Sequence, residues 1–203
     1  MFSISDLQKQ KSDWGIPDEA PVFLCIGRLT KGKRVDLAIR ALSQLKTKDA
    51  HLLIVGSDNG RSDVTQSLKD IAHSEGVSSR VHFITDCKNI PLAYAASDLV
   101  LFPTELQETF GRVSAEAGAM GKIVIASNGG ALPEIVIDKQ TGYLIDAGDL
   151  TSLVARIQDV LDMPGEERKA MEQCARKHIE KNFSADKMFF DTLKIYEEMR
   201  ESN

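Results

Sequence analysis

The residues best suited to chemistry are two carboxylates eight positions apart, Glu108 and Glu116, in the segment ETFGRVSAE. A carboxylate accepts hydrogen bonds from neighbouring hydroxyl groups, so each of them suits a ribose or another sugar. Thr109, Phe110 and Gly111 lie where a loop enters a helix, and the free backbone N–H groups of a helix start attract phosphate. Glycine at position 111 also permits close backbone approach. The segment indicates a site for a nucleotide and a sugar.

A second candidate site is the basic loop GRLTKGKR, residues 27–34, which follows the first expected strand and opens the next helix. Cations beside helix-start N–H groups attract phosphate, and this loop carries Arg28, Lys31, Lys33 and Arg34. The pattern GxxxxGK also resembles a Walker A loop, but the following position needs a Ser or Thr hydroxyl for Mg²⁺. Arg34 cannot ligate a metal, so an ATPase is disfavoured. The GxGxxG fingerprint is missing from this turn, which disfavours a dehydrogenase.

The elements that must position these loops alternate between strand and helix. Continuous apolar segments predict strands at 21–27, 51–55, 81–84, 99–102, 123–126 and 143–145. Periodic apolar residues and turn signals predict helices between them, including 33–46 and 111–120, and three more at 149–162, 165–181 and 184–200, with Asp149 and Ser184 as N-caps. This order predicts an α/β fold, a doubly wound parallel sheet of about six strands with C-terminal helices. Both candidate loops then lie at the carboxyl ends of strands, where such sheets bind ligands.

Composition is that of an ordinary globular protein, with 42% hydrophobic residues and a net charge of −5 over 203 residues. The negative charge argues against a nucleic-acid partner. Cys25, Cys87 and Cys174 are far apart, so we expect free thiols and no zinc site. No signal peptide is recognisable, and no apolar run approaches the roughly 20 residues that span a bilayer. We expect a cytoplasmic protein, with peripheral association at the inner face of the membrane left open.

Taken together, the motifs resemble a known family. GRLxxxK in the first loop, the Glu-x₇-Glu segment with FG inside it, and GKIVIASxGGxxE after it are similar to the retaining glycosyltransferases of family 4, which have the GT-B fold. The resemblance covers about residues 20–200 and is strongest to bacterial enzymes of lipopolysaccharide and capsule assembly. It implies that residues 1–203 are one Rossmann-like donor-binding domain. Residues 1–20 are then a helical lead-in, and 184–200 a helix that packs on something absent from the chain.

The resemblance also assigns roles to residues. Arg28 and Lys33 would bind the diphosphate of a UDP- or GDP-sugar in place of a metal ion, so neither a metal nor another cofactor is expected. Glu108 would hold the donor sugar and Glu116 the ribose. Backbone groups of Gly27, Thr109, Phe110 and Gly111 would contact the donor, and the segment from Thr85 to Lys88, with Leu92 nearby, would contact the base. These last positions complete the implied donor site.

The reaction implied is sugar transfer with retention to a glycan or a lipid-linked acceptor. That acceptor would bind an N-terminal domain that this chain lacks, so the isolated domain would be inactive. A nucleotide-sugar epimerase of the same fold and a non-catalytic nucleotide-binding module remain the alternatives. Three positions depart from the family pattern: Arg34 and Thr85 stand where Gly is frequent, and Lys122 stands where Pro is common.

Overall fold

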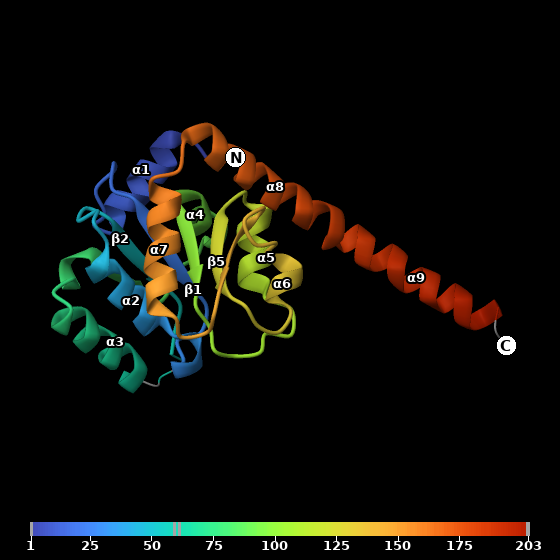
Figure 1. Ribbon diagram of the computed structural model, residues 1–203, viewed down its shortest axis with the longest axis horizontal. Coiled ribbons are helices and arrows are strands. Elements are labelled where there is room, and N and C mark those ends of the chain that lie inside the picture. The colour runs from blue at the N-terminus through green and yellow to red at the C-terminus, as the bar shows by residue number, and fades with distance from the viewer. Residues whose placement is uncertain (1, 59, 61, 202–203) are drawn as a thin grey trace.

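The computed structural model describes residues 2–58, 60 and 62–201, so the predicted span 1–203 includes positions 1, 59, 61, 202 and 203 that lie outside the described residues. Its strands are β1 Val22–Ile26, β2 His51–Val55, β3 Val81–Ile84, β4 Leu99–Phe102, β5 Ile123–Ser127 and β6 Gly142–Ile145. They form one sheet in the order β3-β2-β1-β4-β5-β6, and every pair is parallel. The predicted doubly wound parallel sheet is confirmed (Figure 1).

Helices cover both faces of this sheet, which is why the central strands read as unbroken apolar runs. They are α1 Ile4–Asp13, α2 Val35–Gln44, α3 Ser62–Ser74, α4 Ile90–Ala96, α5 Arg112–Ala119, α6 Leu132–Ile135, α7 Leu150–Leu161, α8 Gly165–Asn182 and α9 Ala185–Glu201, with short 3₁₀ turns at Lys31–Lys33 and Ser78–Arg80. One buried cluster joins the sheet to α2, α3 and α7, and a second joins it to α4, α5, α6 and α8. Side chains of a single strand alternate between the two clusters: Phe23 belongs to the first and Leu24 to the second.

Two helices begin later than the sequence pattern predicts, and both shifts occur at the candidate loops. The helix expected from residue 33 begins at Val35, because a 3₁₀ turn precedes it and Arg34 adopts a left-handed backbone with φ +50°. The helix expected from Gly111 begins at Arg112, with Gly111 at φ +86° as its N-cap. The predicted caps Asp149 and Ser184 are confirmed, since their side chains accept backbone hydrogen bonds from Ser152 and Lys187.

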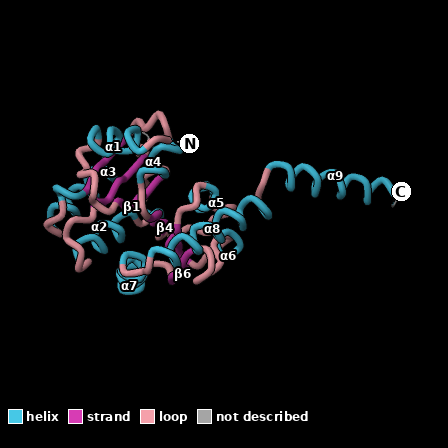
Figure 2. The backbone as a smooth tube through the Cα atoms, turned by 90° about the horizontal axis from the view of Figure 1, so that it is seen from above, coloured by secondary structure: helices cyan, strands magenta, loops and turns pink. Residues whose placement is uncertain are grey.

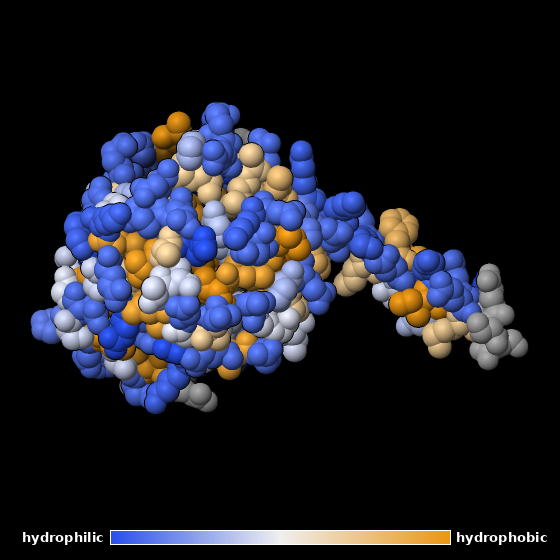
Figure 3. All heavy atoms as spheres, in the orientation of Figure 1, coloured by the Kyte–Doolittle hydropathy of each residue, from blue (hydrophilic) through white to orange (hydrophobic). Residues whose placement is uncertain are grey.

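The last helix, α9, leads away from the body of the molecule (Figures 1 and 2). Several large apolar side chains on it remain exposed in the described part of the chain: Met188, Phe189, Phe190, Leu193, Ile195, Tyr196 and Met199. Figure 3 shows orange and pale orange patches along the protruding helix. Packing of this helix on a part absent from the chain stays a prediction. Among the described residues, no helix combines the length and the apolar character needed to cross a bilayer.

Candidate functional site

The two candidate loops meet because the strands before them are neighbours. Leu24 of β1 pairs with Val100 of β4, and this is where the strand order of the sheet reverses direction. The basic loop leaves β1 and the glutamate loop leaves β4 at the same edge. As a result Lys33 Nζ lies 2.5 Å from Glu108 Oε1, with each side chain only 18% exposed. The ammonium group also lies 4.6 Å from the centre of the Phe102 ring, and the face of an aromatic ring attracts a positive charge.

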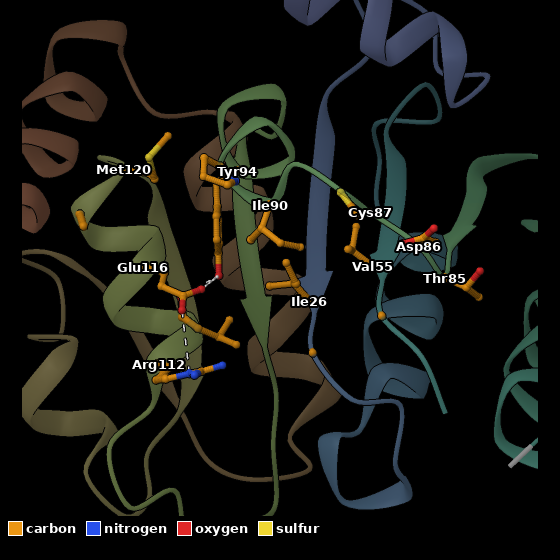
Figure 4. A pocket seen from close by; sticks show the side chains of 15 residues that line it. Ile26, Val55, Thr85, Asp86, Cys87, Ile90, Tyr94, Arg112, Glu116 and Met120 are labelled. Carbon is orange, nitrogen blue, oxygen red and sulfur yellow. Dashed lines mark hydrogen bonds and ion pairs between the residues drawn. The ribbon is translucent and has the colours of Figure 1, made fainter. Parts of the chain in front are cut away.

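A cavity of about 700 Å³ opens between the carboxyl ends of β1 and β2 on one side and α4 and α5 on the other. That volume is within the range of pockets that enclose small ligands. The predicted donor-site residues Gly27, Thr85 and Glu116 all line it. Figure 4 shows Glu116 at one wall, with Thr85 and Asp86 at the opposite end.

The backbone is closely packed at one edge of this cavity. Gly27 and Gly56 both line it, with φ +129° and +145°. A Cβ atom on Gly56 would lie 1.9 Å from the carbonyl oxygen of Gly27, closer than any contact allows. The Gly27 N–H donates to Val55 O at 3.0 Å and the Gly56 N–H to Ile84 O at 2.9 Å. Only glycine at position 56 lets the two strand ends lie this close, with no side chain filling the space where a ligand would lie.

Arg28 and Lys33 of the basic loop lie in different surroundings from Arg34. Arg28 and Lys33 line a small hollow that shares Ile26 and Gly27 with the large cavity. Arg34 instead pairs with Asp36 at 3.0 Å and also with Glu105, on the side of the loop facing α3. Its charge is thus compensated away from the cavity. Glycine adopts a left-handed backbone more readily than other residues. The left-handed conformation of Arg34 therefore gives a physical reason why Gly is frequent at this position in the family that the sequence resembles.

Glu108 is held in place through its backbone by the turn after β5. The Ala131 N–H donates to Glu108 O at 2.8 Å, and the Gly130 N–H donates to Gln107 Oε1 at 2.7 Å. A Cβ atom on Gly130, which has φ +54°, would lie 2.3 Å from Glu108 O. The glycine pair in the third motif therefore supports the loop that carries Glu108.

Glu116 is held through its side chain by a residue that the sequence analysis did not assign. The hydroxyl of Tyr94 donates to Glu116 Oε2 at 3.0 Å, and Arg112 Nε lies 3.9 Å from Oε1 (Figure 4). Tyr94 is 2% exposed, and burial together with the Glu116 carboxylate raises its pKa. A buried tyrosine needs a partner for its hydroxyl, so the lone Tyr in PLAYAASD was a usable signal.

The remaining predicted residues lie outside the cavity wall. Phe110 is 42% exposed and its ring packs edge-on against Phe183, with the centroids 5.8 Å apart. Thr109 is exposed in the loop before α5, and Leu92 lies half-buried in α4; neither is among the described residues that line the cavity, whereas Ile90 and Pro91 are. Within the described residues, no group of three His, Cys, Asp or Glu side chains is placed to hold a metal.

The chain matches the model of the family "Glycosyl transferases group 1" over residues 6–178. Among curated proteins, it is 30% identical to the N-acetyl-alpha-D-glucosaminyl L-malate synthase of Bacillus anthracis, over 94% of this chain and 49% of that protein.

Two solved structures are similar to it along nearly the whole chain. A glycosyltransferase from Rickettsia africae is 26% identical with a TM-score of 0.93, covering 100% of this chain and 54% of its own. HepE of Anabaena, solved in complex with UDP-glucose, is 26% identical with a TM-score of 0.87, covering 95% of this chain and 53% of its own. The chain thus spans about half the length of each of these three proteins.

Proposed function

The chain belongs to the group 1 glycosyl transferases, and we propose that it is the half of such an enzyme that binds the nucleotide-sugar donor. The observation that carries this proposal is the cavity at the carboxyl ends of β1 and β2, whose residue Gly27 also lines the small hollow that reaches Lys33 of the Lys33–Glu108 pair. Support comes from HepE, a protein of similar fold that was solved with UDP-glucose.

The donor divides between the large cavity and the basic loop. The large cavity takes the nucleoside, with the ribose at Glu116 and the base toward Thr85. The diphosphate then extends past Gly27 toward Arg28 and Lys33, which carry positive charge on the same side of the loop. Because Glu108 contacts Lys33, a sugar attached to the second phosphate lies next to its carboxylate.

The chemistry follows from these positions. The bond between the anomeric carbon and the diphosphate breaks, a bond from the acceptor oxygen to the same carbon forms, and the leaving phosphate takes the acceptor proton. Arg28 and Lys33 stabilise the charge that develops on the nucleoside diphosphate, the role that a metal ion has in other transferases. We propose that this occurs with retention of configuration and without a metal or other cofactor, as the resemblance to family 4 implies.

The chain spans about half the length of these relatives. We propose that the other half of such an enzyme binds the acceptor. We propose a glycan or lipid-linked acceptor of the lipopolysaccharide or capsule type, reached from the cytoplasmic side of a membrane. The isolated half then binds the donor and transfers nothing.

Titration calorimetry of the 203-residue chain with UDP, GDP and ADP, in EDTA and then in Mg²⁺, tests the proposal. We expect one diphosphate to bind in EDTA, and Arg28→Ala to weaken it about tenfold, as the loss of one charged hydrogen bond does. Lys31→Ala is the matched control, because Lys31 is an exposed cation of the same loop on the side facing α3. Equal losses in both variants, or binding that requires Mg²⁺, would contradict the proposal.

A further inference from the structure

Tyr94 joins the buried core to the wall of the cavity. Its ring packs in the cluster that contains Ala93, Val100 and Ala117, and its hydroxyl reaches from α4 to α5. There it donates to Glu116 Oε2 at 3.0 Å and lies 3.4 Å from the carbonyl oxygen of Val113. A buried tyrosine needs a partner for its hydroxyl, and the shorter of its two contacts is to a carboxylate at the cavity wall, not to the backbone.

Glu116 needs such a support to act on a ligand. Its side chain is 46% exposed, and an unrestrained glutamate on a helix surface occupies several rotamers, which costs entropy when a ligand fixes one. Arg112 restrains it weakly, because the arginine side chain is 84% exposed and its Nε lies 3.9 Å away. The hydroxyl of buried Tyr94 is the rigid contact.

The contact leaves the carboxylate able to bind sugar. An ionised carboxylate has about four lone-pair sites, and Tyr94 uses one of them. The other sites on Oε1 and Oε2 are available to two vicinal hydroxyl groups. Burial raises the pKa of Tyr94, so its hydroxyl stays protonated and acts as a donor across the working pH range.

We propose that Tyr94 is a positioning residue, which fixes the Glu116 carboxylate in the orientation that selects ribose over deoxyribose. The inference rests on the proposed function, because it takes Glu116 as the ribose ligand. Tyr94 acts through Glu116, and the orientation it sets is present before any ligand enters.

The test compares the dissociation constants of a nucleoside diphosphate and its 2′-deoxy analogue, using whichever of UDP, GDP and ADP binds most tightly. The wild-type chain is expected to prefer the ribose form about tenfold, the effect of one hydrogen bond to a charged group. Tyr94→Phe keeps the ring and its packing, and is expected to bring the preference close to the low value of Glu116→Ala. Adding Tyr94→Phe to Glu116→Ala is expected to change the preference no further.

Tyr143→Phe is the matched control, since Tyr143 is buried in the other core cluster, across the sheet from Tyr94. A Tyr94→Phe chain that keeps the wild-type preference, while Glu116→Ala loses it, overturns the inference and leaves the proposed function standing. A Glu116→Ala chain that keeps the wild-type preference removes the ribose role of Glu116 and overturns both. Circular dichroism confirms that each variant is folded.

Discussion

Lys33 Nζ and Glu108 Oε1 lie 2.5 Å apart although 75 positions separate the two residues in the sequence. The contact exists because β1 and β4 are adjacent in the sheet while three helices and two strands separate them along the chain. It places the cation proposed for the diphosphate directly against the carboxylate proposed for the donor sugar. In the structure each charge is compensated by the other, and a bound donor would compete for both.

Removing each partner should therefore have a different effect on binding. Lys33→Ala is expected to weaken a nucleoside diphosphate about tenfold, because a charged contact to phosphate is lost. Glu108→Gln frees Lys33 and should leave the diphosphate bound at least as tightly, while the additional affinity for the sugar nucleotide falls. Calorimetry with both ligands measures this difference. Equal weakening of the diphosphate by both substitutions would contradict the assignment.

Gly56→Ala tests the close approach of the strand ends. Its Cβ would lie 1.9 Å from Gly27 O at a backbone with φ +145°, so the backbone has to shift. Strain of this kind costs ~1–3 kcal/mol, and the clash adds to it. We expect a lower urea midpoint together with weakened nucleotide binding. Gly165→Ala, which has open space around it, should be neutral or slightly stabilising.

Lys122, which stands where Pro is common in the family, stabilises the end of a helix. Its ammonium group donates to Ala95 O at 3.1 Å and Ser97 O at 2.7 Å, at the end of α4, and burial lowers its pKa. Lys122→Met keeps the stem but leaves these carbonyl groups without their donor, which is expected to cost ~1–3 kcal/mol of unfolding free energy. Urea denaturation measures it, with exposed Lys169→Met as the control. Equal stability of the two variants would show that Lys122 does not cap α4.

The histidine pair near the amino-terminal ends of β2 and β3 predicts a pH dependence of stability. His51 Nδ1 and His82 Nε2 lie 2.8 Å apart, and burial lowers the pKa of both, with the His82 charge lowering that of His51 further. Just below pH 6.5 these histidines bind more protons in the unfolded chain than in the folded chain. The free energy of unfolding therefore rises with pH through that range and reaches its full value above it. His82→Gln should reduce this rise between pH 5 and 7, whereas exposed His73→Gln should not. Urea midpoints across that range decide, and an unchanged rise in His82→Gln would contradict the prediction.

Much of the fold was predictable because it depends on local patterns. Apolar runs such as VFLCI and HLLIV identify doubly covered strands, and the alternation with helices fixes a parallel sheet. Loops that follow strands in such a sheet must share its carboxyl edge, which is why the two candidate loops could be expected to meet. The late start of α2 at Val35 was not predictable, because nothing in the side chain of Arg34 signals a left-handed backbone.

The details of the site depend on contacts that spacing cannot show. Tyr94 and Glu116 meet because α4 and α5 pack on the same face, which the sequence alone does not establish. The contact of Leu92 with the base stays a prediction, but its neighbours Ile90 and Pro91 line the cavity and Leu92 does not, because successive positions of a short helix face different directions. Phe110 was expected to contact the donor through its backbone, which stays a prediction, and the packing of its ring against Phe183 was not foreseen.

A crystal structure of this chain with its tightest nucleoside diphosphate would test the central claim most directly. We predict the ribose within hydrogen-bonding distance of Glu116 and the diphosphate beside Gly27, in contact with Arg28 and Lys33. A nucleotide bound instead in the depression between the basic loop and α3, or with its ribose away from Glu116, would contradict the account.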